Sequence, residues 1–252
     1  MITIISILFV LYVFVFLVSL YLEDNGIADI FWWFGFMVIA GLWFFFYSDE
    51  NLAQTLITFL IFMWGTRLTL YIGIKNLNHS KEDARYAKWR SEWTYVKTRS
   101  FFQVYMLQGV LMCIIAIPIF LVHLGSYESS FLLSVIGGAI ALFGFFYETR
   151  ADKELASFVK TKKKWQILTA WLRKYHRYPQ YFGESMFWLG VSIVASQVSI
   201  FAFIGWIVIT LLLRYVSGVP LLEQRYEWDK KYAKYSKKTN IFLPDWTLIF
   251  KK

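Results

Sequence analysis

Long stretches without charged residues constrain this sequence more than any other feature. About 20 helical residues are needed to cross roughly 30 Å of hydrocarbon. Stretches that reach or approach this length are residues 1–22, 30–47, 52–74 with Arg67 as the one charge, 101–124 and 131–147. A further stretch, residues 185–213, has 29 uncharged residues. It is too long for one upright helix and predicts two helices within residues 181–216, joined by a turn near 196–199.

The composition also indicates a membrane protein. Of the 252 residues, 58% are hydrophobic and 17% are charged, whereas soluble domains have roughly 25% charged residues. This excludes a soluble, a disordered or a disulfide-rich secreted protein. The single cysteine, Cys113, lies inside an apolar stretch, so we predict neither a disulfide framework nor a cysteine metal cluster. The first apolar stretch has no basic start and no small-residue cleavage site, which predicts a retained helix.

The basic residues predict the topology. Every Lys and Arg except Arg67 and Arg214 falls in residues 75–99, 150–177 or 225–252, and the loops at 49–51, 125–130 and 196–199 have none. Loops rich in Lys and Arg stay in the cytoplasm. We therefore predict an all-α integral membrane protein with seven transmembrane helices, its N-terminus outside and its C-terminus cytoplasmic. This role explains the net charge of +9 without a nucleic-acid partner. No linker is evident, so residues 1–252 are predicted to form a single transmembrane domain.

Charged residues within or beside the apolar stretches are candidates for function, because charge is costly in hydrocarbon. They are Asp29, Arg67, Glu148, Asp152, Glu184 and Arg214. Both arginines have a second interpretation, in which the long side chain reaches the membrane interface. Glu148 and Asp152 are four residues apart and share one helical face. Two carboxylates on one face suit recognition of hydroxyl or amide groups, or ligation of a cation.

Motifs for the common cofactor sites are missing from the sequence. His79, His123 and His176 are dispersed, so we predict no metal site. Without a Gly-x-Gly-x-x-Gly or Walker sequence, a nucleotide would bind outside the Rossmann and P-loop schemes. Without Gly-x-Ser-x-Gly, nothing indicates a hydrolase.

Two basic segments are unusually rich in aromatic and acidic residues. Residues 82–90 combine arginine with tyrosine, tryptophan and carboxylates, which favours a pocket that stacks rings and binds phosphates. Residues 175–184 are the most specific stretch in the chain. There Pro179 can begin a helix, Gly183 permits a close backbone approach, and Glu184 would lie about one turn inside the membrane.

This second segment matches a known family signature. The matching residues are Arg177, Pro179, Tyr181, Phe182, Gly183 and Glu184, while Tyr178 replaces a usual His and Gln180 a usual Asn. Weaker matches follow in order along nearly the whole chain, at 29–35, 64–68, 82–90, 101–108, 148–152, 188–190, 218–223 and 232–235. On these residues the chain resembles the steroid 5-alpha-reductase family, and most closely its bacterial membrane branch of unknown function.

The resemblance implies an NADPH-dependent reductase of a carbon–carbon double bond conjugated with a carbonyl, in a lipid or steroid-like substrate. It implies a bacterial inner-membrane protein whose cofactor site faces the cytoplasm, with residues from about 145 to 252 as the main cofactor-binding part. Beyond the lipophilic substrate and membrane lipid, no obligate protein partner is evident. The implied catalytic residues are Asp29, Trp64 and Glu184. The implied cofactor-binding residues are Arg67, Arg85, Tyr86, Arg90, Glu148, Asp152, Tyr175, Arg177, Gln180, Tyr181, Glu184, Trp188, Tyr232 and Tyr235.

Two alternatives stay open. Trp64 stands where steroid-reducing members have a tyrosine, and an indole donates a hydrogen bond but cannot transfer a proton as a phenol can. Asp29 is then the candidate donor to the carbonyl, unless it only caps the second helix. As a second function, a methyltransferase of the isoprenylcysteine carboxyl type has a similar C-terminal element and binds S-adenosylmethionine. A membrane scaffold or small transporter is a third possibility.

Overall fold

The computed structural model describes residues 2–77, 82–163, 166–226, 228–245 and 247. Every regular element in these ranges is helical, which confirms the predicted all-α class. The chain divides into two compact units. The first comprises Met1–Ser134 with Ala195–Ala202, and the second comprises Val135–Val194 with Phe203–Lys252.

The first unit is built on three long helices, α1 (Ile2–Leu22), α2 (Ile27–Tyr47) and α3 (Leu52–Leu77). After the short α4 (Ala84–Glu92), a near-continuous helix follows as α5 (Val96–Arg99), the π-helical η1 (Ser100–Met106) and α6 (Leu107–Ile115). The short α7 (Ile117–Val122) and η3 (Ile200–Ala202) complete the unit. Pro118 explains the break between α6 and α7, because proline lacks an N–H group and clashes with the carbonyl four residues earlier.

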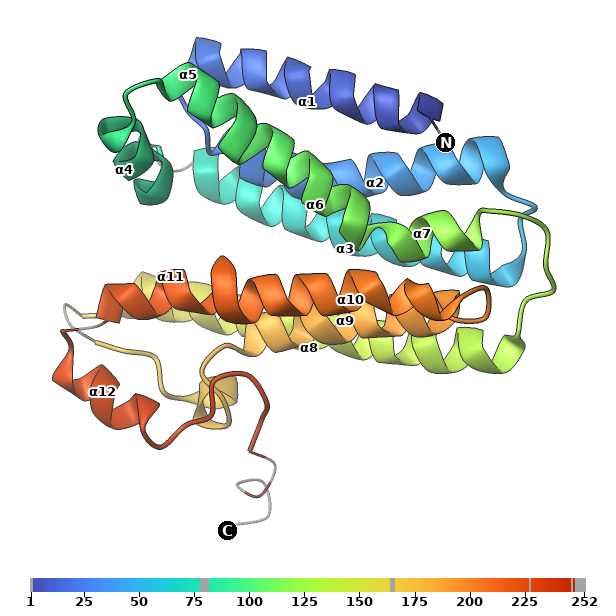
Figure 1. Ribbon diagram of the computed structural model, residues 1–252. Coiled ribbons are helices and arrows are strands. Elements are labelled where there is room, and N and C mark those ends of the chain that lie inside the picture. The colour runs from blue at the N-terminus through green and yellow to red at the C-terminus, as the bar shows by residue number, and fades with distance from the viewer. Residues whose placement is uncertain (1, 78–81, 164–165, 227, 246, 248–252) are drawn as a thin grey trace. The chain divides into compact units, whose positions relative to one another are not determined.

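The second unit is built on α8 (Phe131–Thr161), α9 (Pro179–Ala195) and α10 (Phe203–Leu211). The 3-10 turn η2 (Trp171–Lys174) precedes α9, and the π-helical η4 (Leu212–Val216) continues α10. Three short elements follow: α11 (Val219–Glu223), η5 (Gln224–Tyr226) and α12 (Lys230–Ser236). Figure 1 shows α8, α9 and α10 running along one another, with α12 at one end.

Glycines let α8 and α9 approach closely. A Cβ atom on Gly144 would lie 2.3 Å from the backbone nitrogen of Phe187, and one on Gly190 would lie 2.3 Å from that of Ala141. No real side chain tolerates such distances, so only glycine fits at this crossing, as at many helix pairs in membranes. Helix α10 is held to α9 by polar groups, because Trp206 Nε1 donates to Ser185 Oγ at 3.1 Å.

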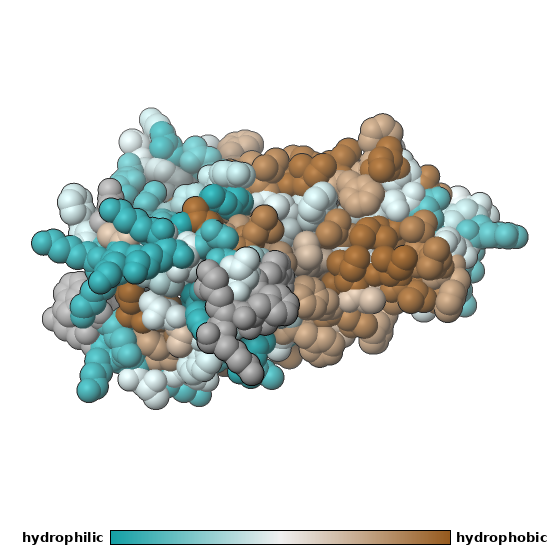
Figure 2. All heavy atoms as spheres, turned by 90° about the horizontal axis from the view of Figure 1, so that it is seen from below, coloured by the Kyte–Doolittle hydropathy of each residue, from teal (hydrophilic) through white to brown (hydrophobic). Residues whose placement is uncertain are grey.

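Among the described residues, six helical stretches are long and apolar enough to cross a membrane, judged by length and composition, and they identify an integral membrane protein in contact with lipid. These are Thr3–Leu22, Ile27–Tyr47, Leu52–Asn76, Val96–Ile115, Phe131–Thr161 and Ile200–Tyr226. The predicted span that is not among these six is the sixth in chain order, and it corresponds to α9, which has 17 residues. Seven spans, the orientation of the termini and a single domain stay predictions. Figure 2 shows hydrophobic side chains along the helices of one face and hydrophilic ones toward both ends, most of them at the end that carries α12.

Local signals in the sequence placed several helix boundaries correctly. Helix α9 begins at Pro179 and ends at Ala195, so the predicted turn near 196–199 is confirmed. The fifth predicted stretch ended at residue 147, but α8 continues to Thr161. The difference arises because a charged residue ends an apolar stretch but does not end a helix. On the charged extension, Arg150 and Glu154 form an ion pair at 2.8 Å across one helical turn, which supports the helix.

Candidate functional site

The signature segment 175–184 is held in place by the C-terminal end of the chain. The backbone N–H of Arg177 donates to the carbonyl of Asn240 at 2.8 Å, and that of Tyr178 donates to Ile241 at 3.3 Å. In return, the N–H of Asp245 donates to the carbonyl of Tyr175 at 3.0 Å. The two segments therefore form one layer at the polar end of the second unit.

His176 joins this layer to α8. Its Nδ1 lies 2.7 Å from the carbonyl oxygen of Phe242, and its Nε2 lies 2.8 Å from the hydroxyl of Tyr147. A carbonyl only accepts, so Nδ1 carries the hydrogen and Nε2 accepts from the phenol. The ring is fully buried, and burial lowers the pKa of His176 to about 4. His176 therefore serves as a neutral structural connection.

Glu223 is the hub of a second set of contacts. It accepts hydrogen bonds from Arg177 Nη1 at 2.7 Å, from the hydroxyl of Tyr178 at 2.8 Å and from that of Tyr232 at 2.6 Å. Burial, with the hydrogen bond to Glu223, raises the pKa of Tyr232 to about 12, so this phenol stays a donor at neutral pH. Tyr178, which stands where the resembled family usually has a His, thus links the signature segment to Glu223.

Arg173 organises the turn before α9. Its guanidinium donates to the carbonyl oxygen of Arg177 and, at 3.2 Å, to the side-chain oxygen of Gln180. The hydroxyl of Tyr235 donates to the carbonyl oxygen of Arg173, which ties α12 to the same turn. Sequence reasoning missed Arg173 and left Glu223 out of the predicted site. Arg173 is one of several basic residues in the segment 150–177, and Glu223 is 46 positions from Arg177 in sequence, so no local signal distinguished either of them.

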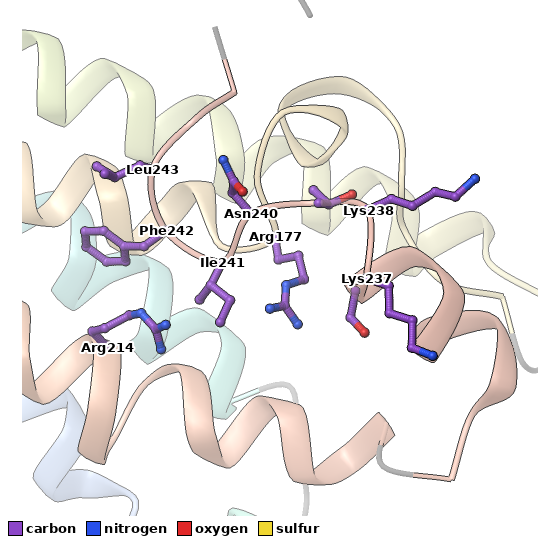
Figure 3. Close-up of a pocket in the computed structure, with 10 residues that line it drawn as sticks. Arg177, Arg214, Lys237, Lys238, Asn240, Ile241, Phe242 and Leu243 are labelled. Atoms are coloured by element: carbon purple, nitrogen blue, oxygen red, sulfur yellow. The ribbon is translucent and has the colours of Figure 1, made fainter. Parts of the chain in front are cut away.

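A cavity of about 590 Å³ opens beside this framework. Arg177 and Arg214 point toward the space bounded by the C-terminal segment, as Figure 3 shows. Lys237 and Lys238 line it as well, and none of its lining residues is acidic. The remaining lining residues are Ser236, Thr239, Asn240, Ile241, Phe242 and Leu243. Four cationic side chains around one cavity suit an anion, and guanidinium groups suit phosphate in particular.

The predicted carboxylates of the second unit lie on α8 and α9. Glu148 and Glu184 are each 3% exposed, and Asp152 is half-buried one turn further along α8. A Cβ atom added to Gly183 would lie 2.6 Å from the backbone nitrogen of Glu148. The close crossing of α8 and α9 therefore brings the backbones of Glu148 and Glu184 near each other. Neither of them lines the basic cavity.

Other predicted residues of this unit lie around the framework. Tyr181 stacks on Tyr178 with the ring centroids 5.9 Å apart, and Trp188 is fully buried on α9. The ammonium group of Lys174 lies 5.9 Å from the ring centroid of Tyr175. Of the predicted residues, only Arg177 lines the cavity of Figure 3.

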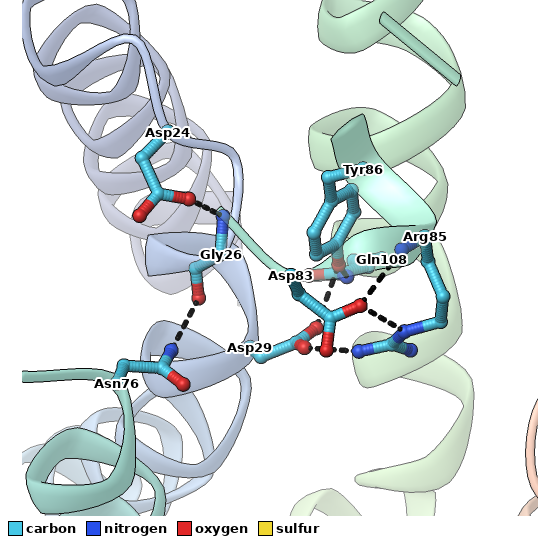
Figure 4. A network of polar contacts seen from close by, with 8 residues as sticks. All are labelled: Asp24, Gly26, Asp29, Asn76, Asp83, Arg85, Tyr86 and Gln108. Carbon is cyan, nitrogen blue, oxygen red and sulfur yellow. Dashed lines mark hydrogen bonds and ion pairs between the residues drawn. The ribbon is translucent and has the colours of Figure 1, made fainter. Parts of the chain in front are cut away.

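The first unit contains a separate polar cluster around Asp29. Arg85 Nη2 lies 2.6 Å from Asp29 Oδ2, and the hydroxyl of Tyr86 donates to Asp29 Oδ1 at 2.6 Å. Arg85 Nε also donates to Asp83 at 2.9 Å, and Gln108 lies behind Tyr86 (Figure 4). The interpretation of Asp29 as a simple helix cap is wrong. The N-cap of α2 is Gly26, and Asp29 lies in the first turn, where it accepts from two side chains.

Arg90, Trp64 and Arg67 also belong to the first unit. Arg90 Nη2 donates to Glu82 at 3.0 Å, and Glu82 also accepts from the backbone of Asn25 at 2.9 Å. Trp64 is fully buried on α3 in an edge contact with Trp33, with ring centroids 5.1 Å apart, and Arg67 is half-buried one turn later. A pocket that joins these residues to those of the second unit stays a prediction.

No group of three or more His, Cys, Asp or Glu that could hold a metal occurs in the described part of the chain. His79 lies outside the described residues, as does the end of the third basic segment, residues 248–252.

Comparison with known families places the chain in a family. The model of a family described as a protein of unknown function, DUF1295, matches residues 15–239, which is most of the chain. No curated protein and no solved structure matches the sequence. The match bears out the predicted family of unknown function, while the relation to steroid 5-alpha-reductases stays a prediction.

Proposed function

We propose that this chain, which belongs to the DUF1295 family, is a membrane-embedded NADPH-dependent reductase. Its substrate would be a lipid-soluble molecule with a carbon–carbon double bond conjugated with a carbonyl. The proposal rests on the resemblance of residues 175–184 to a reductase signature and on the basic cavity beside that segment.

The charge of the cavity is the observation that carries the proposal. NADPH contains a pyrophosphate and a further phosphate on its adenosine ribose, and all of these are anionic. S-adenosylmethionine contains no phosphate and carries a positive sulfonium. A cavity lined by Arg177, Arg214, Lys237 and Lys238, with no acidic lining residue, favours the first ligand and disfavours the second. The methyltransferase is therefore the weaker candidate.

Each group of residues has a proposed part in this function. When bound, NADPH would supply the hydride. The arginines and lysines of the cavity would hold its phosphates, and Glu148 and Glu184, buried at the glycine crossing, would hold hydroxyl or amide groups. In the first unit, Asp29 stays the proposed donor to the substrate carbonyl; its carboxylate accepts from Arg85 and Tyr86 and would have to take up a proton before it could donate. We propose that the cofactor site faces the cytoplasm, because most of the residues that line the cavity belong to the basic segments 150–177 and 225–252. A bacterial inner membrane is what the family resemblance implies.

Ligand titration of the detergent-solubilised protein tests the proposal. NADPH should bind and S-adenosylmethionine should not, as measured by the quenching of tryptophan fluorescence. Loss of NADPH absorbance in the presence of a lipophilic enone should then report turnover. Binding of S-adenosylmethionine alone would establish the alternative, and binding of neither ligand would exclude both enzymes.

A further inference from the structure

A second cavity, of about 470 Å³, lies in the same unit and is lined by four lysines. They are Lys174, Lys231, Lys234 and Lys238, and the other lining residues are Ile167, Thr169, Tyr235 and Thr239. None of these residues is acidic, so the lysine ammonium groups are not balanced within the lining. The cavity therefore attracts an anion, and the two threonine hydroxyls add hydrogen-bond donors.

The two basic cavities are neighbours. Lys238 and Thr239 line both of them. Lys231, Lys234 and Lys238 follow one another at three- and four-residue spacing, which places them on one side of α12 and its last turn. Ser236 and Lys237 lie between them in sequence and line the other cavity. Helix α12 thus separates a cavity with two arginines from a cavity with lysines only.

Helix α12, which contributes residues to both cavities, is anchored at both ends. Asp229 caps its N-terminus by accepting from the backbone N–H groups of Lys231 and Tyr232 at 2.8 and 3.2 Å. The hydroxyl of Tyr232 binds Glu223, and that of Tyr235 binds the carbonyl oxygen of Arg173. None of these anchors uses a lysine side chain, which leaves the lysines of α12 for a ligand.

A ligand that carries two separate phosphate groups fits this pair of cavities. Building on the proposed function, we propose that the lysine cavity binds the 2′-phosphate of NADPH, while the arginine cavity holds the pyrophosphate. A phosphate monoester carries a charge of about −1.5 to −2 at pH 7, which suits clustered ammonium groups. Lys231 and Lys234 would then determine selectivity for NADPH over NADH, which lacks this phosphate.

Equilibrium binding to the full-length chain in phosphatidylcholine nanodiscs tests the assignment. For the double variant Lys231→Ala/Lys234→Ala, we expect the Kd for NADPH to rise at least about tenfold and the Kd for NADH to change by less than about twofold. Lys230→Ala is the matched control. It removes a lysine from the same helix that lines neither cavity, and it should leave both constants unchanged.

Adenine nucleotides that lack the nicotinamide half of the cofactor give a second, more selective test. Adenosine 2′,5′-bisphosphate should compete with NADPH better than adenosine 5′-monophosphate in the wild type, and this advantage should vanish in the double variant. Lys231→Arg/Lys234→Arg should restore it, because the charge is kept. An equal loss of NADPH and NADH affinity, or unchanged selectivity in the double variant, would overturn the inference alone. Failure of the wild type to bind either dinucleotide would overturn the proposed function as well.

Discussion

The two units use the same residue types in opposite ways. In the first unit, Arg85 lies against Asp29 and Asp83, and Arg90 lies against Glu82, so both arginines of the segment 82–90 already have carboxylate partners. In the second unit, Arg177 is bound by Glu223, but Arg214, Lys237 and Lys238 line a cavity without acidic residues. The local balance of charge, more than the presence of arginine beside aromatic rings, thus distinguishes a structural cluster from an anion site.

The largest expected effect comes from removing the one carboxylate of the second cluster. Glu223→Ala would leave the guanidinium of Arg177, which is 8% exposed, without its carboxylate, and the phenols of Tyr178 and Tyr232 with only each other as partners. Breaking a buried ion pair costs about 3–5 kcal/mol, and partial exposure of Glu223 reduces the expected loss to about 2–4 kcal/mol. Thermal unfolding in detergent measures it. Glu92→Ala is the comparison, because its ion pair with Lys88 is exposed on both sides; an equal effect there would contradict the role of Glu223 as a hub.

Acidic pH should destabilise the second unit through His176. Its pKa is about 4 in the folded chain, below the ordinary value of 6.5. The unfolded chain therefore binds a proton more readily, and stability is lost as the pH falls from about 6.5 toward 4. A shift of this size corresponds to about 3 kcal/mol at most. Unfolding measured from pH 7 to pH 4.5 should show this dependence in the wild type. His176→Gln should flatten it, and an unchanged slope in that variant would assign the effect to other groups.

A matched pair of arginine variants compares the two regions directly. Arg214→Gln should weaken NADPH binding by about tenfold to a hundredfold, since a charge-assisted hydrogen bond contributes about 1.5–3 kcal/mol. Arg85→Gln should change NADPH affinity by less than about twofold, because Arg85 is engaged by two carboxylates. Fluorescence titration measures both. If Arg85→Gln has the larger effect, the anion site lies in the first unit and our assignment is reversed.

The features that the sequence predicted have local causes. Uncharged length predicted the helices, and Pro179 marked the start of α9 because proline suits the first turn of a helix. The framework of the site arises from contacts between distant residues. Arg177 and Glu223 are 46 positions apart, and His176 and Phe242 are 66 apart. No periodicity or motif specifies such pairs. The sequence therefore showed that Glu223 matches the resembled family, but it did not show which residues Glu223 contacts. Similarly, nothing in the stretch 82–90 showed that its arginines bind carboxylates of the same unit.

The smallest expected effect concerns Asp29, whose contacts permit both a structural and a chemical role. Asp29→Asn keeps an oxygen that can accept from either Arg85 or Tyr86, so the cluster should lose only about 1 kcal/mol of stability. NADPH affinity should be unchanged, because Asp29 lies in the first unit and the basic cavities lie in the second. If Asp29 provides a proton to the substrate, kcat should fall at least about tenfold, or 1.4 kcal/mol of barrier. Tyr86→Phe is the control, since it removes the phenol that donates to Asp29 but keeps the carboxyl. Normal turnover in Asp29→Asn would reduce the cluster to a link between α2 and α4, and would leave the second unit as the only part of the chain with a proposed chemical role.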